Sequence, residues 1–424
     1  MSKLVNHRSV SALAAVLLAA IVLGSMSPAV SDWVKGPEAK EDVPVLDDAG
    51  ATASSVEATV NAYNGFAFDL YRRYSDGDGN ILFSPYSIST ALSMTYEGAR
   101  GLTAEEMEAV FGFLEDPSER QPSVARIYNT LNGEGREYAL HTVNALWMQQ
   151  DYNVLEEYVN AINNYYGGEA NVLDFEAEPD ESRLIINEWV EERTNERIRD
   201  LFPAGSIDSA VRLVLTNAIY FKGDWLYEFD EAATSGEDFY VTPSTVVMAD
   251  MMSLHGSFNY VDAGLFQLLE LPYAGGDVSM LVLLPGEGRM GEVEAQLSAE
   301  RLGEWVAMME ETEVDVYLPR FTFETKYFMM EDLAGMGMPT AFTGEADFSG
   351  MTGTQELYID MVVHQAFIEV NEAGTEAAAA TGVSMRLTSA GPGEVFRAER
   401  PFVFLIRDAD TGVMMFMGRV SSPG

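Results

Sequence analysis

The stretch NEAGTEAAAATGVSMRL, Asn371–Leu387, sets four consecutive alanines between a Gly-Thr pair and a short apolar run. Alanine loses no side-chain entropy in a helix, so the stretch suits a short surface helix. At period two from Thr375 onward, however, Val383, Met385 and Leu387 share one face, and the two charged residues, Glu376 and Arg386, lie on the other. That alternation is typical of a strand with one buried side. Gly374, just before it, permits the backbone angles that a hinge needs. We therefore interpret the stretch as a segment that is able to form a strand but is not yet part of a sheet.

The composition indicates a large folded protein with a strong negative charge. The 424 residues are 47% hydrophobic, which is enough for a large core and excludes disorder for most of the chain. The 67 acidic residues outnumber 25 basic ones, giving a formal net charge of −42, and they are spread along the sequence. This charge repels nucleic acid and anionic membranes, so we expect neither as a partner. We interpret the distributed acidity with few lysines as a halophilic adaptation, because molar salt screens charges beyond roughly 3 Å.

The N-terminus has the order of a secretory signal, in which basic residues, an apolar run and small residues follow one another. The apolar run, Val10–Gly24, is short for a membrane span, but an uncleaved anchor fits nearly as well as a cleaved signal. Residues 1–31 are therefore predicted to be a signal peptide or N-terminal anchor. The body of the protein is expected to be extracellular, secreted or tethered to the outer face of the cell membrane. Residues 32–58 lack periodicity and are interpreted as a flexible linker, and residues 59–424 as one domain.

No pattern in the sequence predicts catalysis, a cofactor or a metal site. The chain has no cysteine, which excludes disulfides, thiolate catalysis and cysteine-ligated metals. None of the four histidines is at metal-ligand spacing from another, and neither G-x-S-x-G nor a phosphate loop occurs. His364 lies in an apolar strand pattern, where a hydrogen-bonded core histidine is the more common case. We therefore predict that the protein is not an enzyme.

Helical patterns come early in the chain and strand patterns come late. Val60–Tyr74 places apolar residues at helical spacing, and further helices are expected to begin near Ser84 and Thr103. The strand patterns are Leu213–Phe221, Phe266–Tyr273, Val278–Pro285, Val314–Phe323 and Leu357–Val370. This order favours an α+β fold over an alternating parallel one.

Several segments, in the right order, resemble the serpin (serine protease inhibitor) family. NILFSPYSISTALSMTYEGARGLTAEEM, Asn80–Met107, is similar to the first serpin signature. LVLTNAIYFKGDWLYEFD (Leu213–Asp230), LPRFTFE (Leu318–Glu324) and the closing RPFVFLIRDADTGVMMFMGRVSSP (Arg400–Pro423) also match. The resemblance covers about residues 59–424 and places Asn371–Leu387 where serpins carry the hinge of their reactive loop.

The resemblance implies the serpin fold: one domain of three β-sheets with eight or nine helices and an exposed reactive loop. It also implies suicide inhibition of serine endopeptidases. The target cuts the loop and forms an acyl-enzyme, and the loop then inserts as a new strand in the largest sheet. The alternative is a non-inhibitory serpin with a binding, chaperone or structural role. No cluster of basic residues predicts a polyanionic activator, and we expect a monomer.

Individual residues acquire roles by their position in the family pattern. The reactive bond is expected between Thr388 and Ser389, fourteen residues after the hinge glycine, which favours an elastase-like or subtilisin-like target. A shift of one or two residues would instead place Leu387 or Arg386 at the cut. Trp225 matches the tryptophan where the loop first enters the sheet. The hinge comprises Gly374, Thr375, Glu376, Ala377, Ala378, Ala379, Ala380 and Thr381, and a buried polar group, here called the opening cluster, comprises Ser84, Ser87, Asn217 and His364.

Overall fold

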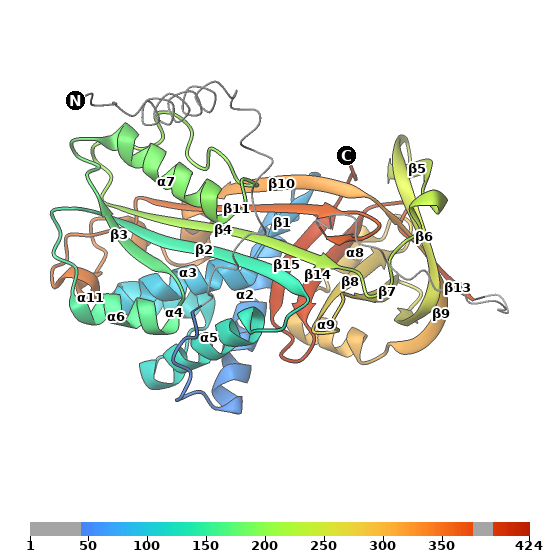
Figure 1. The fold of residues 1–424 in the computed structure, drawn as a ribbon, viewed down its shortest axis with the longest axis horizontal. Helices are drawn as coiled ribbons and strands as arrows, with labels where there is room; N and C mark the ends of the chain where they lie inside the picture. Colours follow the sequence, from blue (N-terminus) through green and yellow to red (C-terminus); the bar gives the residue numbers. More distant parts are fainter. Residues whose placement is uncertain (1–43, 376–392) are drawn as a thin grey trace, which may run out of the picture. The chain divides into compact units, whose positions relative to one another are not determined.

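The computed structural model describes residues 44–375 and 393–424 (Figure 1). The predicted signal or anchor segment lies outside the described residues, as does nearly all of the predicted linker. The described part contains ten α-helices and fifteen strands, which confirms the α+β class. The helices outnumber the predicted eight or nine because α8, α10 and α11 have only five, seven and four residues.

The helices are α2 (Ala53–Tyr74), α3 (Pro85–Gly98), α4 (Gly101–Phe111), α5 (Pro117–Asn132), α6 (Glu156–Tyr165), α7 (Pro179–Arg193), α8 (Met290–Glu294), α9 (Ala299–Val306), α10 (Met330–Met336) and α11 (Ser349–Thr352). The strands are β1 (Ile81–Phe83), β2 (Tyr138–Gln149), β3 (Glu169–Leu173), β4 (Leu213–Asp224), β5 (Ser235–Thr242), β6 (Thr245–Asp262), β7 (Phe266–Pro272), β8 (Val278–Pro285), β9 (Glu310–Pro319), β10 (Phe321–Phe328), β11 (Met361–Val370), β12 (Gly374–Thr375), β13 (Glu394–Arg397), β14 (Phe402–Asp408) and β15 (Met414–Val420).

The strands form two hydrogen-bonded networks. One is a six-stranded sheet with the order β10-β11-β12-β4-β2-β3. The other has nine strands in the order β1-β15-β14-β8-β7-β6-β9-β13, with β5 paired to β6. The long strand β6 divides this second network, because it pairs with β9 over Met251–Tyr260 and with β7 only over Tyr260–Asp262. The network is therefore two sheets that share one strand, and residues 44–375 and 393–424 form the three sheets that were predicted.

The six-stranded sheet is covered on both faces. Figure 1 shows α7 over one face and the helices α2–α6 on the opposite side. Side chains of β2 and β4 alternate accordingly. Val143 and Trp147 pack in one apolar cluster with residues of α7, and Leu146 and Met148 belong to the main core with α3. The period-two alternation thus decides which polar residues of β4 and β11 can face α3.

Helix α3 runs between the six-stranded sheet and β15, and nearly all of its residues are buried. Its sequence allows this because small serine, threonine and alanine residues alternate with larger apolar ones. Pro85 stands at the first helical position, and the Ser84 hydroxyl accepts a hydrogen bond from the Ser87 N–H at 3.1 Å. Ser84 and Ser87 are thereby fixed at a buried helix start beneath the sheet.

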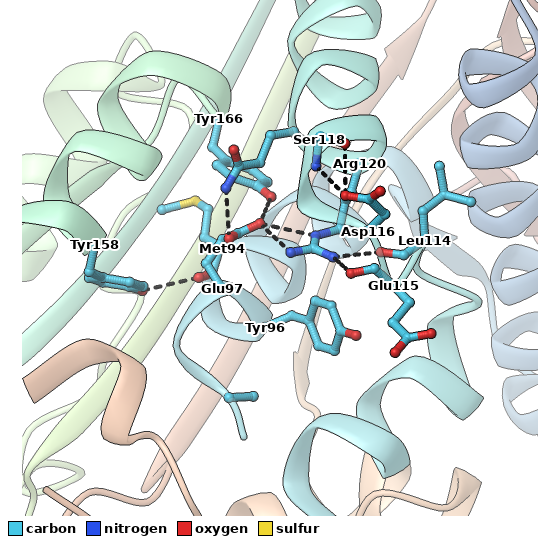
Figure 2. Close-up of polar contacts among 12 residues, drawn as sticks. Met94, Tyr96, Glu97, Leu114, Glu115, Asp116, Ser118, Arg120, Tyr158 and Tyr166 are labelled. Atoms are coloured by element: carbon cyan, nitrogen blue, oxygen red, sulfur yellow. Dashed lines mark hydrogen bonds and ion pairs between the residues drawn. The ribbon is translucent and has the colours of Figure 1, made fainter. Parts of the chain in front are cut away.

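A buried ion pair holds the other end of α3 to α5 and α6 (Figure 2). Glu97 Oε1 accepts hydrogen bonds from Arg120 Nε at 3.0 Å, from Arg120 Nη2 at 2.9 Å and from the Tyr166 hydroxyl. The two charged side chains are only 6% and 8% exposed. The Tyr158 hydroxyl donates to the Met94 carbonyl at 3.1 Å. Removing one partner would leave a buried charge uncompensated, so this contact fixes α3 strongly.

The folded domain starts earlier than the predicted boundary at residue 59. Helix α2 begins at Ala53, and the segment before it packs on α5. The Leu46 backbone donates to and accepts from the Asn129 side chain at 2.9 Å in both bonds, and Asp48 pairs with Arg126. The predicted linker therefore ends before Val45. The sequence pattern did not reveal this because these contacts join residues about 80 positions apart in the chain.

Candidate functional site

The site lies where β4 and β11 are paired at the centre of the six-stranded sheet. These strands run parallel and are joined directly from Met361–Val214 to Ala366–Ile219. Within this ladder His364 stands opposite Asn217, and both side chains are fully buried. A further strand could enter the middle of the sheet only by separating these two strands.

The structure brings all four residues of the opening cluster together beneath this ladder. The Ser84 N–H donates to His364 Nε2 at 3.1 Å. Because a backbone N–H can only donate, Nε2 must be the unprotonated nitrogen, and Nδ1–H donates to Asn217 Oδ1. Asn217 Nδ2 in turn donates to the Ser87 hydroxyl at 2.6 Å. The start of α3 is thus bonded to both strands that would have to separate.

Asn144 of β2 is a fifth member that the sequence analysis missed. It stands opposite Asn217 in the antiparallel ladder, and its Oδ1 accepts from Asn217 Nδ2 and, at 3.3 Å, from the Ser87 hydroxyl. The sequence pattern that could have predicted this role is a polar residue at an inward position of the strand segment VNALWM. Asn144 extends the opening cluster from β11 through β4 to the next strand.

Burial lowers the pKa of His364 to about 3. The hydrogen bonds point the same way, since a proton on Nε2 would face the Ser84 N–H as a second donor. His364 is therefore a neutral core residue at physiological pH, as its apolar strand pattern predicted.

Above the opening cluster, the beginning of the hinge already forms a strand. In β12, Gly374 pairs with Asp224 and Thr375 with Gly223 of β4, and Thr375 also pairs with Val370 of β11. A Cβ at residue 374 would lie 2.1 Å from the Gly223 carbonyl oxygen and 2.7 Å from the Asp224 Cα. Only glycine fits there, because the backbones approach too closely for any side chain. The first two hinge residues therefore sit between β4 and β11.

Thr375 is held in place by aromatic residues. Its side chain is buried, and its hydroxyl lies 2.7 Å from the Tyr273 hydroxyl. Tyr273 stacks on Trp225 with ring centroids 4.5 Å apart. Trp225 binds the segment before the hinge, since its backbone N–H donates to Ala373 at 2.8 Å and its indole N–H to Asn371 at 3.0 Å. Trp225 thus contacts the segment just before the hinge, and Tyr273, which the sequence analysis did not single out, contacts Thr375 itself.

A salt bridge beside the hinge was also missed. The Glu372 side chain is only 5% exposed and pairs with Arg320 at 2.6 Å, and it accepts a hydrogen bond from the Thr234 hydroxyl. Burial acts to raise the pKa of Glu372, but the hydrogen bonds from Arg320 and Thr234 hold it below its usual value. The charged carboxylate ties the segment before the hinge to the start of β10.

The other predicted site residues lie outside the described residues. These are the hinge residues Glu376–Thr381 and the reactive bond between Thr388 and Ser389. The described chain resumes at Gly393 and continues into β13, which pairs with β9. Within residues 44–375 and 393–424, no group of three or more His, Asp or Glu side chains is arranged to hold a metal ion. No helix in the same ranges is long and apolar enough to cross a membrane.

Comparison with known proteins identifies the family. The profile described as Serpin (serine protease inhibitor) matches residues 61–423, and the chain belongs to the serpin family. An uncharacterized serpin-like protein of Thermococcus kodakarensis is 43% identical over 368 residues, which are 86% of this chain and 85% of that protein. The leukocyte elastase inhibitor of Equus caballus is 37% identical, covering 87% of this chain and 100% of its own. Uncleaved ovalbumin superposes with a TM-score of 0.78 at 33% identity, covering 86% and 100% of the two chains.

Membership of this family carries a general statement about function. Serpins are generally protease inhibitors rather than enzymes, and those that inhibit typically act on serine proteases. The family also includes non-inhibitory members. The fold is therefore explained by homology as well as by the residue patterns.

The neutral state of His364 predicts an acid-sensitive stability. Its folded pKa of about 3 lies below an unfolded value of about 6.5, so the unfolded chain binds more protons between these values. The stabilisation is complete above about pH 6.5 and is lost as the pH falls toward 3, by about 2 kcal/mol at pH 5. Urea unfolding of wild type and His364→Gln at pH 5, 6 and 7 measures this. A difference between the two proteins that stays constant over that range would contradict the prediction.

The close approach at Gly374 predicts that Gly374→Ala displaces β12. The added methyl group meets backbone atoms, which cannot move aside as a flexible side chain can. We expect Trp225 emission, isolated by comparison with Trp225→Phe, to shift to longer wavelength, and stability to fall by about 1–3 kcal/mol. Gly303→Ala is the matched control, because an added Cβ on α9 meets nothing within 4 Å. Unchanged Trp225 emission in Gly374→Ala would refute the packing described here.

Proposed function

We propose that this serpin is a suicide inhibitor of serine endopeptidases, secreted or tethered to the outer face of the cell membrane. The observation that carries the proposal is β12. Gly374 and Thr375 lie between β4 and β11 at one end, and below them these two strands are paired directly with each other. A loop that continues from Thr375 would extend an existing strand, so it needs no new point of insertion.

The energetics favour insertion once the loop is cut. Each residue added to β12 exchanges one β4–β11 contact for hydrogen bonds on both sides. Val383, Met385 and Leu387 would become buried, worth roughly 1.5–3 kcal/mol each. In the intact protein the loop is attached at both ends, at Thr375 and at Gly393, and full insertion is blocked. The native state is therefore proposed to be kinetically trapped.

The trapped state supplies the mechanism of inhibition. The serine of the protease attacks the carbonyl carbon of Thr388, the peptide bond to Ser389 breaks, and the new amine leaves with its proton. The acyl-enzyme remains attached to the loop, and insertion moves it by about fourteen residues at about 3.3 Å each, on the order of 45 Å. Compression against the far end of the sheet disturbs the oxyanion donors needed for deacylation. The ester therefore persists.

The hinge composition favours inhibition over the alternative. Ala377–Ala380 are small, and the inserting face carries no charge or proline. Such a strand can enter the sheet without forcing the core apart. The alternative hypothesis is a non-inhibitory serpin with a binding, chaperone or structural role, in which the alanines form an exposed helix. The elastase inhibitor named among the relatives supports inhibition.

We also propose that the protein works in high salt. The acids spread along the chain lie close together in places, since Glu310, Glu311 and Glu313 are all exposed on the single strand β9. Repulsion among such charges destabilises the folded protein unless salt screens it.

Incubation with an elastase and a subtilisin tests the inhibitory function. We expect a denaturant-stable covalent complex on a gel and release of a C-terminal peptide that begins at Ser389, as determined by mass spectrometry. A released peptide with a different first residue would refute the predicted position of the reactive bond between Thr388 and Ser389. Cleavage of the loop by several serine proteases without any stable complex refutes inhibition and favours the alternative.

Thr375→Arg tests the insertion step separately. The variant must bury a guanidinium beside Tyr273 and Trp225, where no carboxylate is bonded to Thr375, so insertion slows and deacylation competes. We expect the number of inhibitor molecules consumed per protease trapped to rise at least tenfold. Thr375→Ser keeps the hydroxyl and serves as the control. An unchanged complex yield in Thr375→Arg would show that the strand does not insert through this position.

A further inference from the structure

A cavity of about 450 Å³ lies where three connections of the chain meet, away from the paired strands β4 and β11. One is the end of β5 with its turn into β6, the second follows β8 and leads into α8, and the third joins β13 to β14. Its lining includes Tyr240–Pro243, Pro285–Gly288, Met290 and Glu399–Pro401. This volume falls within the range of small-molecule sites in proteins.

The chemical feature of this cavity is the guanidinium of Arg400. The residue is half-buried, and its Nε donates to the Pro285 carbonyl at 2.9 Å. Among the residues that the structure describes, Arg400 forms no ion pair with a carboxylate. The neighbouring arginines do form them, since Arg397 pairs with Glu237 at 2.5 Å and Arg407 with Glu270 at 2.9 Å. The guanidinium of Arg400 is therefore charged and partly desolvated, and its terminal N–H groups can donate hydrogen bonds to a ligand.

Two carboxylates lie near Arg400 without binding it. Burial lowers the pKa of Arg400, and the charges of Glu399 and Glu287 act in the opposite direction. Glu399 lies 4.0 Å from Arg397, and Glu287 is exposed on the loop before α8. Both weaken the attraction of the cavity for an anion. An anion that binds must therefore contact the guanidinium directly and gain apolar contacts as well.

The walls supply such contacts. Pro243, Pro285 and Pro401 come from the three different connections, and Tyr240 and Met290 add an aromatic ring and a flexible thioether. Flat, rigid apolar walls of this kind suit a planar ring, and the arginine fork suits the two oxygens of a carboxylate.

We propose that this cavity binds a small aromatic monocarboxylate, with its carboxylate on Arg400 and its ring between the prolines. The bound molecule would bridge β5 and the β13–β14 connection, which already meet through the hydrogen bond from the Tyr240 N–H to the Glu399 carbonyl at 2.7 Å. The site uses none of the hinge or opening-cluster residues, so this proposal does not rest on the proposed inhibitory function.

Titration with phenylacetate, followed by calorimetry and ligand-observed NMR, tests the site. We expect saturable binding to the wild type, with at least tenfold weaker binding to Arg400→Gln. Phenylacetamide, which has the same shape without the charge, is also expected to bind at least tenfold more weakly to the wild type. No saturable binding of phenylacetate up to about 10 mM, or equal binding to Arg400→Gln, would overturn the proposal.

Two further variants distinguish specific recognition by Arg400 from general electrostatic attraction of an anion. Arg289→Gln removes an exposed cation on the same loop that is paired with Glu292 at 2.5 Å, and it should leave affinity within about twofold. Glu287→Gln removes a repelling charge from the exposed rim and should tighten binding about two- to fivefold. If Arg400→Gln does not fold, the affinity of Glu287→Gln for phenylacetate still tests the proposed site. Equal losses in Arg400→Gln and Arg289→Gln, or no gain in Glu287→Gln, would refute recognition by Arg400.

Discussion

The direct parallel pairing of β4 with β11 is the constraint on which the rest of the site depends. Below β12 these strands share a continuous ladder from Met361 to Ala366, and this ladder closes the sheet. Every feature around it serves one of two purposes. The opening cluster ties the closed strands to α3, whereas Trp225, Tyr273 and the salt bridge of Glu372 hold the beginning of the loop where the strands diverge. The sheet is thus closed along most of its length, and at one end Gly374 and Thr375 stand between the two strands.

Helix α3 connects this constraint to the helical side of the domain. Its first turn is bonded to β11 and β4 through His364 and Asn217, and its last turn is bonded to α5 and α6 through Glu97. Separation of the strands must therefore be accommodated at both ends of one buried helix. Small hydroxyl and alanine side chains along α3 are buried against the sheet, and the buried ion pair fixes the last turn of the helix.

The α+β class, the three sheets and the positions of the four opening-cluster residues could be predicted because they lie in segments with strong local patterns or family motifs. Asn144 and Tyr273 could not, since their roles depend on the register between strands and on ring stacking. Glu372 finds Arg320 across 52 positions, and no local periodicity encodes such a pairing. The domain start was misplaced for the same reason, because Leu46 depends on a distant residue of α5. Local patterns predict elements, and long-range register decides which polar groups meet.

The early start of the domain would limit the reach of the protein if the proposed membrane anchor is retained. If residues 1–31 remain as a membrane anchor, only the segment 32–44 separates that anchor from Val45, where the packed domain begins. Thirteen residues span at most about 45 Å when fully extended. The reactive loop of an anchored molecule would therefore meet proteases within a thin layer above the cell surface, and a soluble enzyme would have to diffuse into that layer before it could be trapped.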